Sequence, residues 1–213
     1  MALFYQNNID ASTRLGIWHI DEDESFFLQH VPLKKDITHP HKRLQHLAGR
    51  YLLKFLFPEF PQHEILIADT RKPYLADELF HFSISHCGNF AAAIVSTDHR
   101  VGIDIEIPSS KVERVQHKFL HQNEAAFLTS FVNMGPHFHI EMLTVFWSCK
   151  EALYKWYGLG EVNFKECMYL NGDLVLGASD IIDLPYKFCK NTNQDVQLRA
   201  KIFEDIVLSW VVT

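Results

Sequence analysis

Two carboxylates and a glycine alternate with apolar residues in the stretch Val101-Gly102-Ile103-Asp104-Ile105-Glu106. As a strand, this stretch places Asp104 and Glu106 on one face and the β-branched residues on the other, because side chains alternate with a period of two. The two carboxylates are then roughly 6.6 Å apart along the strand and repel each other. A magnesium ion would relieve the repulsion, since it prefers a few carboxylate oxygens together with water and ligand phosphates. An exposed acidic strand is the alternative, because most acidic side chains are simply solvated.

A second set of candidate residues lies between Phe146 and Tyr157. Helical spacing places Trp147, Glu151 and Lys155 on one face of a predicted helix, opposite an apolar face. The order of Glu151 and Lys155 also suits an ordinary surface ion pair. The helix alone therefore does not distinguish a functional face from a solvated one.

Basic residues and a histidine mark the first half of the chain. Arg43, Arg50 and Lys54 fall in or beside a helix predicted from Leu44 to Leu56, where they indicate either a phosphate-bearing ligand or a solvated polar face. His86 ends a predicted strand and shares parity with apolar residues, which favours a buried, hydrogen-bonded histidine. Its place at the strand end also allows contact with a pocket.

The predicted elements indicate an α+β protein. Residues 80–107 predict a three-stranded meander in which Ser83 and Ser85 face outward. The pattern becomes helical after Pro108, with a long helix from 140 to 157 closed by Gly158, and strands predominate from 168 onward. The change of pattern predicts two parts, 1–108 and 109–213.

Composition narrows the classes of function. The chain has 213 residues and a formal net charge of −6, which argues against a general nucleic-acid or bilayer binder. Its four cysteines form no C-x-x-C pair, so neither a zinc knuckle nor a disulfide framework is expected. The first ten residues lack a basic and then apolar leader, and no apolar run is long enough for a membrane span. These features predict a cytoplasmic protein.

Taken in order, the motifs resemble those of the Sfp-type 4′-phosphopantetheinyl transferases, in the holo-acyl-carrier-protein synthase superfamily. The resemblance rests on I-S-H-C at Ile84–Cys87, V-G-I-D-I-E at Val101–Glu106 and W-S-C-K-E-A-L-Y-K at Trp147–Lys155, with K-P-Y at Lys72–Tyr74 before them. Two residues depart from the family pattern. Cys87 replaces a serine, and Arg71 stands where glycine commonly precedes K-P, which leaves the adenine contact uncertain.

The resemblance implies a fold of two similar α+β halves packed as a pseudo-dimer within a monomer. It also implies an enzyme that transfers 4′-phosphopantetheine from coenzyme A to a serine of an apo acyl or peptidyl carrier protein. The transfer would depend on magnesium and release 3′,5′-ADP. The alternatives are a coenzyme A-binding, carrier-docking protein without turnover and a metal-dependent phosphohydrolase. Which carrier is served stays open, as does the choice between magnesium and manganese.

The resemblance also assigns roles to residues. The implied metal ligands are Asp104, Glu106 and Glu151, with Glu124 as a lesser candidate near the metal. The implied catalytic residues are Glu151, Lys155 and Glu106, and the serine proton goes either to Glu151 or to a water activated by Glu106. The residues implied to bind coenzyme A are Arg43, Arg50, Lys72, Ser85, His86, Lys150 and Lys155, with Lys42 as a less certain neighbour.

Overall fold

The computed structural model describes residues 3–33, 36–191 and 193–213. The chain divides into two compact units, Met1–Ile105 and Glu106–Thr213. Each unit combines an antiparallel sheet with helices, so the predicted α+β class is confirmed. Among the residues that the structure describes, no helix is both long and apolar enough to cross a membrane.

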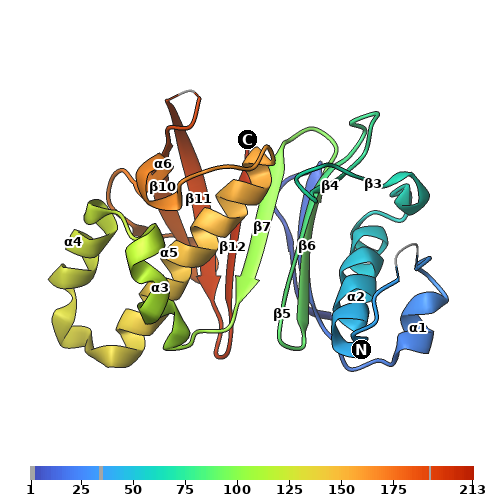
Figure 1. Cartoon of the computed structure of the whole chain (residues 1–213), viewed down its shortest axis with the longest axis horizontal. Coiled ribbons are helices and arrows are strands. Elements are labelled where there is room, and N and C mark those ends of the chain that lie inside the picture. The colour runs from blue at the N-terminus through green and yellow to red at the C-terminus, as the bar shows by residue number, and fades with distance from the viewer. Residues whose placement is uncertain (1–2, 34–35, 192) are drawn as a thin grey trace. The chain divides into compact units, whose positions relative to one another are not determined.

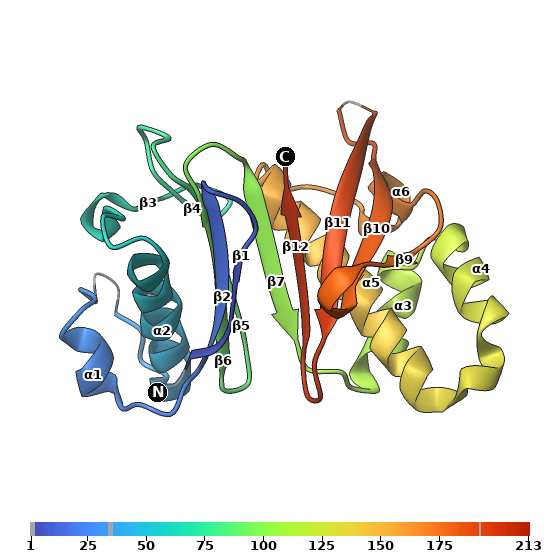
Figure 2. The ribbon, with the colours of Figure 1, turned by 180° about the vertical axis from the view of Figure 1, so that it is seen from behind.

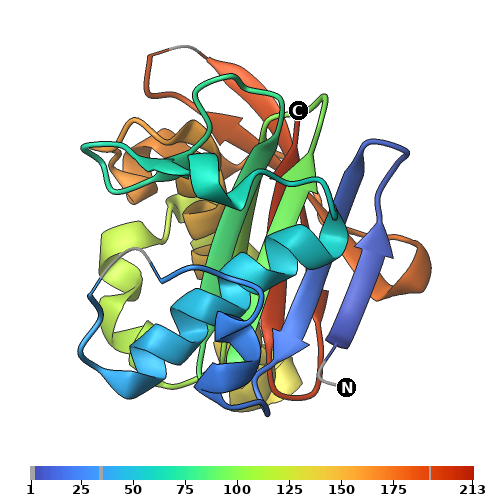
Figure 3. The same cartoon turned by 90° about the vertical axis from the view of Figure 1, so that its right-hand side faces the viewer.

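The first unit is built on a four-stranded antiparallel sheet with the order β1-β2-β6-β5. Helix α2 lies across one face of this sheet, as the cyan helix in Figure 3 shows. The sheet strands are β1 (Leu3–Asn8), β2 (Thr13–His19), β5 (His81–Cys87) and β6 (Phe90–Ser96). The remaining elements of the unit are α1 (Glu24–Leu28), α2 (Pro40–Leu56), the 3-10 turn η1 (Gln62–Glu64), β3 (Leu66–Ile67) and β4 (Pro73–Tyr74). The first unit ends within the strand β7 (Val101–Glu106).

Helix α2 confirms the predicted basic helix and begins four residues before the predicted start. Pro40 lies in the first turn of the helix, where a backbone N–H would have no intrahelical acceptor, so the N–H that proline lacks costs no hydrogen bond. The His39 side chain accepts a hydrogen bond from the Lys42 N–H. Gly49 allows close packing on β5, because a Cβ there would lie 2.6 Å from Cγ2 of Ile84. The apolar face of α2 thus closes one side of the core of the first unit.

The other face of β5 is also covered, which corrects the prediction that its serines face outward. Ser83 and Ser85 are buried, and the Ser83 hydroxyl accepts the backbone N–H of Ile103 in β7. Strict alternation separates the two faces of a strand but does not say whether the second face is solvated. His86, at the end of the same strand, is exposed, so the prediction of a buried histidine is wrong.

The predicted meander is correct for two of its three strands. β5 and β6 form an antiparallel hairpin, with Cys87 paired to Phe90. The other edge of β6 is occupied by β2, which pairs with it from Thr13 to His19, so β7 is not the neighbour of β6. The early strand β2 is separated from β6 by about seventy residues of sequence, and local pattern carries no information about such a pairing.

The second unit contains antiparallel strands in the order β12-β11-β10-β8, with β9 paired to β10. Figure 1 labels β10, β11 and β12 of this set. The long helix α5 packs on this sheet (Figure 2). The helices are α3 (Lys111–Phe119), α4 (Gln122–Ser130), α5 (Gly135–Tyr157) and α6 (Phe164–Cys167), and the 3-10 turns are η2 (Val132–Met134) and η3 (Ala178–Asp180). The strands are β8 (Met168–Leu170), β9 (Val175–Leu176), β10 (Ile181–Phe188), β11 (Gln194–Ile202) and β12 (Val207–Val212).

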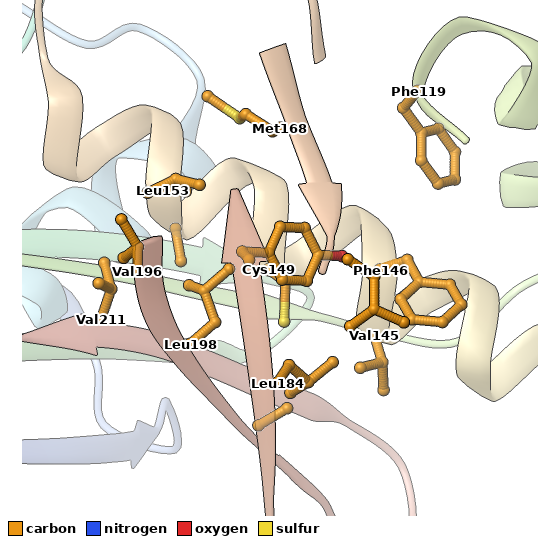
Figure 4. Packing of buried hydrophobic residues seen from close by; sticks show 14 of the residues in the cluster. Phe119, Val145, Phe146, Cys149, Leu153, Met168, Leu184, Val196, Leu198 and Val211 are labelled. Carbon is orange, nitrogen blue, oxygen red and sulfur yellow. The ribbon is translucent and has the colours of Figure 1, made fainter. Parts of the chain in front are cut away.

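Helix α5 is the central element of the second core. Figure 4 shows Cys149 and Leu153 projecting from α5 among buried side chains that include Leu198 of β11 and Val211 of β12. Gly158 ends the helix in the left-handed conformation at φ 74°, as predicted from its position. The packing fixes the rotation of α5 about its axis and therefore decides which of its polar residues reach the surface.

Candidate functional site

Strand β7 presents the two carboxylates predicted from the sequence. Asp104 is buried, and its Oδ1 accepts a hydrogen bond of 2.8 Å from the Ser85 hydroxyl. Glu106 is half-buried, and its Oε1 accepts a hydrogen bond of 3.0 Å from Nε1 of Trp147. A neutral donor therefore orients each carboxylate, in the way that outer hydrogen bonds commonly orient metal ligands. Asp104 is not the solvated acidic residue of the alternative interpretation.

Helix α5 carries the second predicted face. Trp147, Glu151 and Lys155 are half-buried, while most of the neighbouring positions from Met142 to Tyr157 are buried. The indole of Trp147 also packs edge-on to the Phe119 ring, with 5.2 Å between centroids. The helical pattern thus correctly predicted that these three residues share a face apart from the apolar one. It did not reveal that Trp147 donates to Glu106, because that hydrogen bond joins residues 41 positions apart in the sequence.

Lys150 is a correction to the sequence prediction. Its side chain has no exposed surface, and its Nζ lies 2.7 Å from Oε2 of Glu124, itself fully buried. The same Nζ also donates to the backbone carbonyls of Phe119 and Phe164. A lysine that is enclosed and bonded in this way does not contact a ligand, so we exclude Lys150 from the coenzyme A set.

Glu124 is corrected for the same reason. Its carboxylate accepts the backbone N–H groups of His121 and Leu170 in addition to the Lys150 ammonium. With His121 it forms the capping box that starts α4. Burial and the Glu124 charge raise the pKa of the nearby Tyr186 hydroxyl well above its ordinary value. Glu124 therefore joins α4, β8 and α5 in a core network rather than a metal site.

The predicted phosphate-binding residues of the first unit occupy different surroundings. Arg43 lies in an ion pair of 2.7 Å with Glu24, and both side chains are about 30% exposed. Arg50 is half-buried and lines a cavity of about 330 Å³ together with His46, and burial lowers the pKa of its guanidinium. Ser85 holds Asp104 directly. Arg43 and Ser85 thus each contact a carboxylate, and Arg50 lies beside a cavity.

Lys72 lines another cavity of the first unit, of about 380 Å³, and Arg100 lines the same cavity. Burial, and then the charge of Arg100, lower the pKa of the Lys72 ammonium to about 8. The sequence analysis assigned no role to Arg100. Arg100 directly precedes β7, and a residue at the end of a strand is held in position by that strand. This position could have marked Arg100 as a candidate in the sequence.

The donor set on β7 suits magnesium. Within the described ranges 3–33, 36–191 and 193–213, no group of three or more histidine, cysteine, aspartate or glutamate side chains is arranged to hold a metal ion. Magnesium does not need such a group, because one or two carboxylates complete its shell with waters and ligand phosphates. Asp104 and Glu106 provide the hard oxygen donors that it prefers.

Comparison with known proteins confirms the resemblance predicted from the motifs. Residues 100–197 match the model of the 4′-phosphopantetheinyl transferase superfamily, a segment that contains β7 and α5. The chain is 31% identical over 117 residues to 4′-phosphopantetheinyl transferase AcpT of Escherichia coli K12, which covers 54% of this chain and 57% of the relative.

Two further relatives have similar names. The chain is 30% identical over 116 residues to 4′-phosphopantetheinyl transferase gsp of Aneurinibacillus migulanus, covering 54% of this chain and 46% of the relative. It is 28% identical over 138 residues to 4′-phosphopantetheinyl transferase HetI of a Nostoc strain, covering 60% and 57%. The chain thus spans about half the length of the curated relatives it matches.

Proposed function

We propose that this protein, which carries the 4′-phosphopantetheinyl transferase superfamily pattern over residues 100–197, transfers 4′-phosphopantetheine from coenzyme A to a serine of an apo acyl or peptidyl carrier protein. The observation that carries the proposal lies inside the matched segment. There, Asp104 and Glu106 of β7 each have one oxygen held by a neutral donor. Such a pair is suited to a cation that in turn binds phosphate oxygens.

The proposed reaction exchanges one phosphorus–oxygen bond for another. The serine oxygen bonds to the β-phosphorus of coenzyme A, the bond to the α-phosphate breaks, and 3′,5′-ADP leaves. When bound, magnesium supplies positive charge that stabilises the pyrophosphate oxygens. The proposed ligands of this ion are Asp104 and Glu106, and Glu151 is a further candidate that rests on the family resemblance alone.

The remaining roles concern charge and protons. Lys155 contacts the pyrophosphate and stabilises the charge that develops on the leaving phosphate. His86 binds a phosphate group, and its exposed position is compatible with this role, whereas the Ser85 hydroxyl is buried and donates to Asp104, so Ser85 acts by orienting that carboxylate. The serine proton passes to Glu151 or to a water activated by Glu106.

The nucleotide end of coenzyme A is assigned to Arg43, Arg50 and Lys72. The Arg50 and Lys72 cavities support this assignment, because each encloses a basic side chain in a space large enough for a small polar group. Further parts of the proposal are that the enzyme acts as a monomer in the cytoplasm and that its partner is an apo carrier protein.

The proposal is tested by incubating the protein with coenzyme A, magnesium and a panel of apo carrier proteins, followed by intact mass spectrometry of each carrier. We expect one carrier at least to gain the phosphopantetheine mass. Asp104→Asn and Lys155→Met should each slow this gain by roughly a hundredfold or more, in line with the loss of one preorganised charge at a reacting group. The matched controls are Asp173→Asn and Lys118→Met, which change exposed residues.

The same assay separates the two alternatives. A coenzyme A-binding protein without turnover would bind coenzyme A in calorimetry and leave every carrier unmodified. A phosphohydrolase would release product from coenzyme A in the absence of any carrier. Either result, with the folded state verified by circular dichroism, would contradict the proposed transfer.

A further inference from the structure

The turn between β5 and β6 follows directly after the strand end that carries His86. Its two central residues are Gly88 and Asn89, and Gly88 has a φ of 53°. A positive φ at the first central residue is typical of the tight type II′ hairpin turn. His86 pairs with Ala91 across this hairpin, so the path of the turn determines where the end of β5 and its exposed histidine lie.

Helix α2 holds this turn through the side chain of Gln45. Nε2 of Gln45 donates a hydrogen bond of 2.8 Å to the backbone carbonyl of Gly88. That carbonyl lies beyond Cys87 and Phe90, the last strand pair of the hairpin, so the strand ladder supplies no donor for it. Figure 1 shows the turn and the first residues of α2 at the same end of the unit.

Gln45 is itself fixed in position. The residue is buried, with only 7% of its surface exposed, and its Nε2 also lies 3.2 Å from Nε2 of His41, one helical turn earlier. An amide nitrogen carries two N–H groups, one for the Gly88 carbonyl and one for the imidazole. The other side of the turn is held as well, because the backbone N–H of Ile20 donates to the Asn89 carbonyl at 2.8 Å.

We propose that Gln45 is a positioning residue for the binding of coenzyme A, and that it acts by fixing the turn that follows His86. The inference rests on the proposed function, which assigns His86 to a phosphate group of coenzyme A. Without its donor, the Gly88 carbonyl would turn towards water, and the histidine two residues earlier would move with the peptide. A binding group is effective only when its supporting residues hold it within a fraction of an ångström.

The effect is expected at His86 rather than at the neighbouring Ser85. Ser85 is buried, and its hydroxyl is held by a separate hydrogen bond of 2.8 Å to Asp104. Loss of the Gln45 bond should therefore disturb the exposed end of β5 and leave the β7 carboxylates in place. In kinetic terms, the KM for coenzyme A should rise while kcat stays within about twofold.

Calorimetric titration of the full chain with coenzyme A and magnesium tests the inference. Gln45→Met keeps the length of the side chain and removes the donor. Gln45→Asn keeps the amide but withdraws it by about one C–C bond, or 1.5 Å, and it provides a second variant should the first not fold. The control is Gln197→Met, which changes an exposed glutamine of β11 whose amide also donates to a backbone carbonyl.

Both Gln45 variants should weaken coenzyme A binding roughly tenfold, as is common when the partner that orients a binding residue is lost, whereas the control should bind like the wild type. Circular dichroism verifies that each protein is folded. Wild-type affinity in a folded Gln45 variant would overturn the inference.

A double-mutant cycle distinguishes positioning from a purely structural role. His86→Ala should weaken coenzyme A binding by itself, and adding Gln45→Met should cause little further loss, because Gln45 acts through His86. Losses that simply add would show that Gln45 acts elsewhere, and the inference would be rejected even if the protein modifies a carrier. Coupled losses in a protein that modifies no carrier would uphold the inference and reject the proposed function.

Discussion

Lys150→Met should destabilise the protein without impairing the binding of coenzyme A to the molecules that remain folded. The substitution preserves much of the side-chain volume but removes the ammonium that bonds Glu124 and the carbonyls of Phe119 and Phe164. The Glu124 carboxylate would then remain fully buried without a cation beside it, and the backbone N–H groups of His121 and Leu170 would still donate to it. A buried charge that loses its partner is among the most costly changes in a protein core.

The size of the effect follows from this burial. Loss of one partner of a buried ion pair costs about 3–5 kcal/mol of unfolding free energy. For a chain of this length, each kcal/mol lowers the melting temperature by roughly 2–4 °C, which gives a fall of about 6–20 °C. Urea unfolding and thermal scans measure both quantities. The control Lys118→Met should change neither by more than about 0.5 kcal/mol, since Lys118 is exposed.

The double variant Lys150→Met/Glu124→Gln supplies the critical comparison. Neutralising Glu124 as well should recover at least half of the lost stability, because no uncompensated charge remains in the core. A Lys150→Met protein that unfolds like the wild type but no longer binds coenzyme A would refute the structural role and restore the ligand contact inferred from sequence.

Three further outcomes are expected. Gly49→Ala should lower stability by about 1–3 kcal/mol, because the new methyl group overlaps Ile84; equal urea midpoints for the variant and the wild type would contradict the packing. Lys72→Met should raise the free energy of unfolding most below pH 8, where the folded protein must keep a buried charge on Lys72. The gain should shrink between pH 8 and 10.5, because there the unfolded chain keeps the proton that the folded Lys72 has lost. A gain that does not depend on pH would count against the lowered pKa. Trp147→Phe should reduce carrier modification by roughly tenfold at limiting magnesium and less at saturation, since Glu106 loses its donor; unchanged kinetics would remove Trp147 from the site.

Local sequence signals predicted the elements that carry the candidate site. Period-two alternation located β7, and the apolar period with Gly158 located the end of α5, because both depend on neighbours in sequence. The same helical period also placed Lys150 four residues after the buried Phe146 and three before the buried Leu153. That spacing was sufficient evidence that the lysine faces the core, even though lysine is rarely buried.

Distant pairings explain the remaining errors. The serine face of β5 is covered by β7, and β6 pairs with β2. The alternation of apolar and polar residues within each strand predicts neither contact. The cavity shared by Lys72 and Arg100 likewise brings together residues 28 positions apart. The folded structure was needed to show that these two charges act on each other.

The stoichiometry of 3′,5′-ADP release tests the proposed transfer most directly. With coenzyme A, magnesium and a competent apo carrier, we expect one 3′,5′-ADP for each carrier serine that gains phosphopantetheine, and no release when the carrier is omitted. Release without a carrier, or no release with any carrier of the panel, would contradict the assignment.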